Sequence, residues 1–194
     1  MLKGYDQMIA RQAFTLVVVD VQERLAAVMD ERDRVVAAAA RLARTAALCG
    51  APIIVTRQYP RGLGSTLPEL EEVLVELAQC GASVLGVDKM AFCCAAEPDF
   101  VEALRSTGRS QIVLCGMETH ICIAQTALAL IAEGYAVHVA ADACCSRERE
   151  AHDAALARMR HAEAVVTWSE SVMYEAVGTA GTDEFKKLLE IVKA

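Results

Sequence analysis

The stretch that decides the fold is "QIVLCGMETHICIAQTALALIAEGY", residues 111–135. Its first part, 111–116, is a short and continuous apolar run, which predicts a strand buried on both faces. Its second part, 119–134, has the length and apolar spacing of a helix that ends at a glycine, with Thr119 as the expected cap. Cys122 therefore lies where a buried strand gives way to a helix. It is either a small apolar filler or a nucleophile.

The same alternation of strand and helix extends in both directions along the chain. Strands are predicted at 14–20, 51–57, 83–89, 111–116, 135–142 and 163–168. Helices are predicted at 31–50, 67–81, 97–108, 119–134 and 147–162, with further helical turns over 169–194. Strands that are apolar on both faces and alternate with helices are typical of a parallel sheet covered on both sides. We expect an α/β fold with three α/β/α layers, a Rossmann-like, mostly parallel sheet of about six strands, and a single domain over residues 1–194.

Composition narrows the possible partners. The 194 residues carry a formal net charge of −7 and no Lys/Arg run longer than two, which argues against nucleic acid because phosphate binding requires a basic patch. No apolar run reaches the roughly 18 residues of a membrane span, and the first residues lack the apolar centre of a signal peptide. We therefore expect a cytoplasmic protein that does not enter a membrane. Most of its eight cysteines would be reduced, and at least six would act as small hydrophobic residues.

Three reactive side chains follow predicted strands. In open α/β sheets, ligands bind beyond the carboxyl ends of the strands. Asp20 ends the first strand, Lys89 ends the third, and Cys122 follows the fourth. A helix start and a nearby ammonium group would lower the pKa of the thiol, and a carboxylate could move its proton to a leaving amine. Each residue alone fits a solvated loop or the core, but the set of three favours catalysis.

Other cysteines and the histidines carry weaker indications. The vicinal pairs Cys93–Cys94 and Cys144–Cys145 have neither C-x-x-C spacing nor a histidine cluster, so we expect no metal and no cofactor. His120 precedes Cys122 by two residues, and residues two apart at a helix start do not face each other. The remaining histidines are expected in the core (His138) or in solvent (His152 and His161).

Motifs over most of the chain resemble a known family. They are "VVVDVQ" (17–22), "VDKMAF" (87–92) and "GMETHICIAQTALALIAEGYAVHVAADACCSR" (116–147). They resemble the isochorismatase-like cysteine hydrolases, and "TRQYPRGLGSTLPEL" (56–70) is similar to the isochorismatase domain-containing branch. The resemblance covers roughly residues 14–175. It implies that Asp20, Lys89 and Cys122 form a catalytic triad.

The resemblance also implies how a substrate would be held. The N–H groups of Glu118 and Cys122 would stabilise an oxyanion, and the Met117–Glu118 bond would be a cis peptide that shapes this site. The residues expected to contact the substrate are Gln22 in the D-x-Q motif, Gln58 at a strand end, Phe92 as an apolar wall, and Met117 and Thr119 beside Glu118.

Two departures from the family indicate the chemistry. The segment "TRQYPRGLG" (56–64) lacks the aspartate and two histidines that bind a metal in related nicotinamidases. Cys122 is present, whereas isochorismatases that cleave a vinyl ether often lack this cysteine. We therefore expect hydrolysis of a small amide or related C–N substrate through a covalent acyl-cysteine. The alternatives are a thiol redox protein and a catalytically idle scaffold. The resemblance further implies a homo-oligomer, a dimer or larger.

Overall fold

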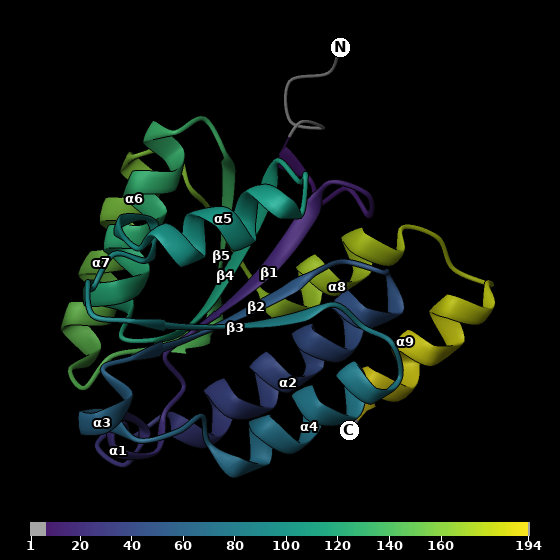
Figure 1. The fold of residues 1–194 in the computed structure, drawn as a ribbon. Helices are drawn as coiled ribbons and strands as arrows, with labels where there is room; N and C mark the ends of the chain where they lie inside the picture. Colours follow the sequence, from purple (N-terminus) through teal and green to yellow (C-terminus); the bar gives the residue numbers. More distant parts are fainter. Residues whose placement is uncertain (1–6, 194) are drawn as a thin grey trace.

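A parallel sheet of six strands forms the centre of the molecule (Figure 1). The computed structural model describes residues 7–193. The strands are β1 (Phe14–Val19), β2 (Ile53–Gln58), β3 (Val84–Lys89), β4 (Gln111–Met117), β5 (Ala136–Cys145) and β6 (Val165–Thr167). Their order is β3-β2-β1-β4-β5-β6, and every neighbouring pair is parallel. The predicted α/β class is confirmed. The strand order reverses between β1 and β4, which is where such sheets bind their ligands.

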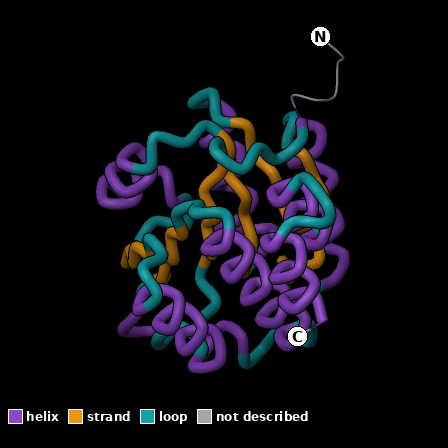
Figure 2. Tube along the Cα trace, turned by 90° about the vertical axis from the view of Figure 1, so that its right-hand side faces the viewer, coloured by secondary structure: helices purple, strands orange, loops and turns teal. Residues whose placement is uncertain are grey.

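Two sets of helices cover the two faces of the sheet. The first set is α2 (Arg32–Leu48), α4 (Pro68–Gln79), α8 (Ser169–Val177) and α9 (Asp183–Lys193). The second set is α5 (Pro98–Ser106), α6 (Ala124–Ala132) and α7 (Arg149–His161). Figure 1 shows the sets on opposite sides, and in Figure 2 the strands run inside an outer layer of helices. Side chains of β1 alternate between the two cores, Leu16 and Val18 in one, Val17 and Val19 in the other.

The connections differ from the prediction in several places. The loop after β1 contains the short helix α1 (Glu23–Ala26), the loop after β2 contains α3 (Pro60–Leu63), and η2 (Cys94–Ala96) follows β3. β5 continues to Cys145, three residues beyond the predicted end. The predicted helix after β4 begins with a π-helical turn, η3 (Thr119–Ile123), which leads into α6. None of the helices over residues 7–193 combines the length and apolar character needed to cross a membrane.

Thr119 does not cap the helix, contrary to the prediction. The turn has no side-chain cap, and its N-cap position is occupied by Glu118. The hydroxyl oxygen of Thr119 lies instead 2.8 Å from Nδ1 of His152 on α7. This contact between elements uses the hydroxyl that a cap would need.

Gly116 allows a very close approach between β1 and β4. It is paired with Val19 across the two strands and has a φ of +123°. A Cβ atom at this position would lie 2.0 Å from the carbonyl oxygen of Val19, where no side chain fits. Because Val19 precedes Asp20 and Gly116 precedes the turn with Cys122, this glycine determines how closely the two functional segments approach.

We predict that Gly116→Ala lowers the free energy of unfolding by more than about 4 kcal/mol, because the backbone of one strand must move. Gly50→Ala is the matched control, since Gly50 also has a positive φ (+67°) but no atom within 4 Å of the added methyl group. The free energy of unfolding of the control should fall by only about 1–2 kcal/mol, because alanine is less stable than glycine in the left-handed conformation. Urea unfolding of both variants measures the difference, and equal losses would contradict the steric argument.

His138 lies in the core, as predicted. It is 1 % exposed on β5, and no residue between 7 and 193 forms a hydrogen bond with either ring nitrogen. Burial lowers its pKa to about 4. The ring is therefore neutral at physiological pH, because protonation would place an unpaired charge in an apolar layer.

The low pKa of His138 predicts acid sensitivity. The unfolded chain takes up a proton near pH 6.5, whereas the folded chain does so only at about pH 4. The stabilisation that depends on a neutral His138 is therefore fully present above pH 6.5, the pKa in the unfolded chain. It is lost as the pH falls from 6.5 to about 4, which lowers the free energy of unfolding by up to about 3 kcal/mol. We predict that His138→Leu flattens this decline, measured as urea unfolding at a series of pH values. His161→Leu, at an exposed histidine, should keep it.

Candidate active site

Asp20, Lys89 and Cys122 meet at the carboxyl edge of the sheet. Asp20 directly follows β1, Lys89 ends β3, and Cys122 lies in the turn after β4. Nζ of Lys89 is 2.7 Å from Oδ2 of Asp20 and 3.6 Å from Sγ of Cys122. The exposed fractions of the three residues are 0, 2 and 5 %. The topology thus gathers one acid, one amine and one thiol in a space almost closed to water.

Asp20 is held in place from β2. Its φ of +53° lies in the left-handed region, which aspartate tolerates better than most residues. Oγ1 of Thr56 donates a hydrogen bond of 2.7 Å to Oδ1 of Asp20. Oδ2 contacts the ammonium group of Lys89 but accepts no hydrogen bond within the described part of the chain. Oδ1 is therefore held from β2, and Oδ2 faces the ammonium group of Lys89.

Lys89 is surrounded by acceptors. Besides the carboxylate, Nζ donates to Oε1 of Gln58 at 2.7 Å and to the carbonyl oxygens of Ala91 and Phe92 at 3.3 Å each. These contacts compensate for the loss of water around a buried charge. Although burial acts to lower it, the pKa of Lys89 is raised above its usual value because the Asp20 carboxylate stabilises the ammonium form.

Gln22 connects the end of β2 to the loop that follows. Its Oε1 accepts the N–H of Gln58 at 2.7 Å, and its Nε2 donates to the carbonyl oxygens of Gln58 at 3.0 Å and Gly64 at 2.8 Å. The side chain is fully buried and all of its amide is used in these contacts. Gln22 therefore braces the site and does not line the cavity, unlike the predicted substrate contact.

The pKa of the Cys122 thiol is raised, which contradicts the sequence-based expectation of a lowered value. Burial is the largest cause, the negative charge of Asp20 raises it further, and the positive charge of Lys89 lowers it only in part. Losing the proton to solvent would leave a net negative charge in a buried cluster. Transfer of the same proton to Asp20 keeps the cluster neutral overall and avoids that penalty. The geometry thus favours a resting thiol with a base beside it.

A small cavity of about 80 Å³ opens next to Cys122. Its lining residues are Asp20, Leu25, Gln58, Leu63, Phe92, Glu118, Ile121 and Cys122. Of the predicted substrate contacts, Gln58 and Phe92 line it, whereas Met117 and Thr119 are fully buried outside its lining. Sequence reasoning missed Leu25, Leu63 and Ile121. The first two come from short helices inside loops, where no periodic pattern could reveal them.

The residues around the turn η3 are fixed by their own contacts. Oε2 of Glu118 accepts hydrogen bonds from N and Nε of Arg147 at 2.9 and 3.2 Å. The Met117–Glu118 peptide bond is cis. Nδ1 of His120 lies 2.9 Å from the hydroxyl oxygen of Ser146. The oxyanion role of the N–H groups of Glu118 and Cys122 remains a prediction.

His152 is buried, although the sequence predicted a solvated residue. It is 4 % exposed because this side of α7 packs against η3, where the ring meets the hydroxyl of Thr119. Charged residues that face solvent flank His152 along the helix, so the sequence alone suggested that His152 faces solvent too. Burial lowers the pKa of this ring.

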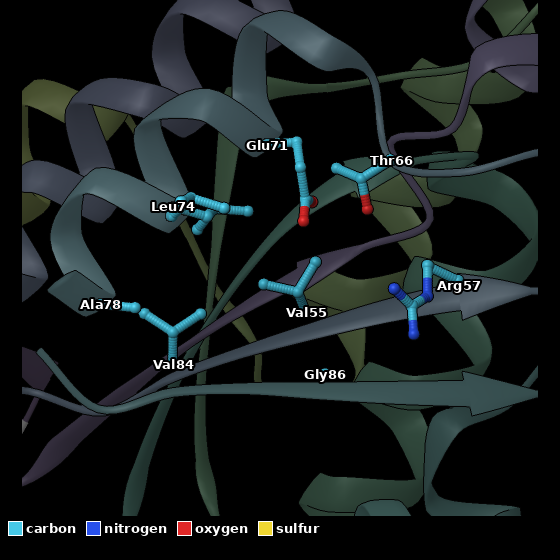
Figure 3. A pocket seen from close by; sticks show the side chains of 9 residues that line it. Val55, Arg57, Thr66, Glu71, Leu74, Ala78, Val84 and Gly86 are labelled. Atoms are coloured by element: carbon cyan, nitrogen blue, oxygen red, sulfur yellow. The ribbon is translucent and has the colours of Figure 1, made fainter.

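A second cavity, of about 150 Å³, lies between α4 and the strands β2 and β3 (Figure 3). Leu74 and Ala78 line it from the helix, and Val55, Val84 and Gly86 line it from the strands. Neither cysteine nor histidine occurs among its described lining residues, and its arginine is paired with Asp88 at 2.6 Å. No thiol with a paired acid and amine lines this cavity, so the smaller one beside Cys122 is the candidate active site.

A metal site is not apparent in the part of the chain that the structure describes. No three His, Cys, Asp or Glu side chains over residues 7–193 are grouped so that they could hold an ion. Cys115 and Cys144 are fully buried, and all eight cysteines are free thiols. That the protein uses no metal and no cofactor remains a prediction.

Comparison with known proteins identifies the family. The sequence profile of the isochorismatase domain matches residues 14–171. The chain belongs to the isochorismatase family. Isochorismatase domain-containing protein 2A of Mus musculus is 39 % identical over 180 residues, which cover 90 % of this chain and 80 % of that protein. The resemblance predicted from the motifs is confirmed, and membership of the isochorismatase family supports a hydrolase.

Solved structures of the isochorismatase fold match nearly the whole chain. MAR1 ribonuclease from Caenorhabditis elegans has a TM-score of 0.86 and 30 % identity, covering 96 % of this chain and 93 % of that one. YcaC from Pseudomonas aeruginosa, with hexane-2,5-diol and covalent acrylamide, has a TM-score of 0.81 and 27 % identity, covering 95 % and 91 %. The three-layer arrangement is therefore the fold of this family.

The charges around Cys122 predict opposite effects of two substitutions on its pKa. Lys89→Met should raise it further, because the ammonium group stabilises the thiolate. Asp20→Asn should lower it, because the carboxylate destabilises the thiolate. The measurement is the rate of alkylation of Cys122 by iodoacetamide against pH, followed by mass spectrometry. In the unaltered chain this rate should still be rising above about pH 9.

Exposed Cys80 supplies an internal reference for alkylation in every variant, because it precedes the start of β3, whereas Lys89 lies at the other end of that strand, and because it is open to solvent. Circular dichroism verifies that each variant is folded. If both substitutions shifted the pKa of Cys122 in the same direction, the electrostatic account would be wrong.

Proposed function

We propose that this protein is a cysteine hydrolase that cleaves a small amide or related C–N bond through an acyl-Cys122 intermediate. The observation that carries the proposal is the single contact chain from Sγ of Cys122 to Nζ of Lys89, 3.6 Å, and on to Oδ2 of Asp20, 2.7 Å, beside a cavity. A nucleophile, a cation and a proton acceptor joined by one chain of contacts are components of covalent acyl transfer.

In the acylation step, Asp20 takes the proton of Cys122 as the sulfur attacks the substrate carbonyl carbon. Lys89 stabilises the negative charge on the sulfur before attack. The backbone N–H groups of Glu118 and Cys122 receive the developing oxyanion. Protonated Asp20 then donates to the leaving nitrogen, the C–N bond breaks, and an amine departs from a thioester.

In the deacylation step, Asp20 is again a carboxylate and accepts a proton from an attacking water molecule. The resulting hydroxide adds to the thioester carbonyl, the C–S bond breaks, and a carboxylic acid leaves. The thiolate recovers the proton from Asp20, which restores the resting thiol. One carboxylate thus serves as base and acid in turn, which requires that one of its oxygens is free to exchange a proton.

Relatives give partial support to this chemistry. The YcaC structure contains covalent acrylamide, and acrylamide is an electrophile that reacts with nucleophiles such as thiolates. The MAR1 relative is described as a ribonuclease. We do not propose RNA cleavage for this chain, because its net charge is −7 and the lysine at the site is already paired with Asp20.

The other two functions fit the site less well. A thiol redox protein commonly pairs two thiols in a C-x-x-C motif, and none of the eight cysteines of this sequence has that spacing. An idle scaffold has no reason to keep an acid, an amine and a thiol in contact in a buried position, since such charges are costly to desolvate. Assembly into a homo-oligomer remains a prediction.

The proposal is tested by incubating the protein with a panel of small aliphatic and aromatic amides and measuring ammonia release. Trapped acyl-Cys122 is identified by mass spectrometry. Cys122→Ala should abolish turnover, and Asp20→Asn should reduce it by about a thousandfold or more because proton transfer is lost. Cys80→Ser is the matched control at an exposed thiol and should keep full activity. Full turnover in Cys122→Ala would refute the covalent mechanism.

A further inference from the structure

The polar groups that line the cavity are already committed to partners within the protein. Asp20 is paired with Lys89 and accepts a hydrogen bond from Thr56. The carboxylate of Glu118 accepts two hydrogen bonds from Arg147. Within the described lining, no arginine, lysine or histidine is present to receive a negative charge on a ligand.

The third polar lining residue, Gln58, is equally occupied. Its Oε1 accepts from Lys89 at 2.7 Å, and its Nε2 donates to the carbonyl oxygen of Met90 at 2.8 Å. Its backbone is held by Gln22. The side-chain amide therefore helps to shape the cavity, but it has little capacity left to form a hydrogen bond with a charged or strongly polar ligand group.

The rest of the wall is apolar and comes from four separate segments. Leu25 belongs to α1, Leu63 to α3, Phe92 to the loop after β3, and Ile121 to η3. These side chains favour an apolar ligand, because contact with them removes its methylene groups from water. A carboxylate placed among them would lose its hydration without a compensating partner.

The size of the cavity limits the length of the ligand. Its volume is about 80 Å³, whereas many ligand pockets measure about 300–1,000 Å³. The space beside Cys122 is therefore small for a ligand pocket, which favours a short acyl chain over a long one.

We propose that this cavity is an acyl pocket that selects short, uncharged aliphatic acyl groups. The inference rests on the proposed function, since the acyl group is the part of the substrate that becomes bound to Cys122. The leaving amine would lie toward the open side, past the exposed ring of Phe92.

The experiment uses 4-nitrophenyl esters of acetic, propanoic, butanoic, hexanoic and octanoic acid, together with the hemisuccinate as an anionic analogue of the butanoyl ester. The activated leaving group is constant, so its contribution cancels across the series. Nitrophenolate release gives the acylation rate, and mass spectrometry locates the acyl group. Subtracting the rate of Cys122→Ala removes hydrolysis that does not involve this thiol.

We expect the rate of Cys122 acylation to be highest for one of the three shortest esters, the acetyl, propanoyl or butanoyl ester, because the cavity is small for a ligand pocket. It should fall by about tenfold or more at the hexanoyl ester, because overfilling a packed space is costly. The hemisuccinate should react about a hundredfold more slowly than the butanoyl ester, because its carboxylate has no partner. An equal rate for all chain lengths, or a preference for the hemisuccinate, would overturn the acyl-pocket inference while leaving the proposed function intact.

Leu63→Ala should move the preferred acyl chain toward the hexanoyl ester by removing part of the wall. Leu85→Ala is the matched control, because Leu85 is a partly exposed leucine on β3 outside the cavity lining. It should leave the chain-length profile unchanged. If no ester acylates Cys122, the proposed function fails first and the acyl-pocket inference fails with it. The wild-type chain-length profile decides the inference even if Leu63→Ala does not fold.

Discussion

The buried ion pair between Asp20 and Lys89 is the interaction on which the site depends. Two opposite charges at 2.7 Å with no exposed surface attract each other strongly, but each has also lost its hydration. Such a pair is maintained only if further hydrogen bonds replace the lost water. Thr56 supplies one to the carboxylate, and Gln58 with two loop carbonyls accepts from the ammonium group. The pair therefore fixes the ends of β1, β2 and β3 relative to one another.

The same pair controls the third member of the cluster. With Asp20 ionised beside it, the thiol of Cys122 keeps its proton, and its pKa is raised despite the neighbouring ammonium group. A thiol that is protonated at rest reacts slowly with oxidants and adventitious electrophiles, because only the thiolate is a strong nucleophile. Under the proposed function, the proton would pass from Cys122 to Asp20 when a carbonyl group occupies the cavity, so that the thiolate would form only next to bound substrate.

Sequence reasoning located the charged cluster but only part of its surroundings, Gln58 and Phe92. Asp20, Lys89 and Cys122 could be predicted to converge, because the carboxyl ends of parallel strands share one edge of the sheet. Leu25, Leu63 and the burial of His152 could not, because they depend on how short loop helices and one helix face pack in three dimensions. The direction of the pKa shift of Cys122 was predicted wrongly for a related reason. A local pattern indicates the nearby helix start and cation, but not the combined effect of burial and a second charge.

The charged cluster and much of the cavity wall are carried by different elements of the fold. The cluster is positioned by the ends of the strands and by the close approach of β1 and β4 at Gly116, where an added methyl group would lie 2.0 Å from the backbone of Val19. Part of the apolar wall is joined to the cluster, because the carbonyl oxygens of Ala91 and Phe92 accept from Lys89 and Ile121 shares the turn η3 with Cys122. Leu63 differs, because it makes none of the hydrogen bonds to Asp20 or Lys89. Under the proposed function, a change at Leu63 would therefore alter the fit of the substrate while the contacts of the charged cluster are preserved.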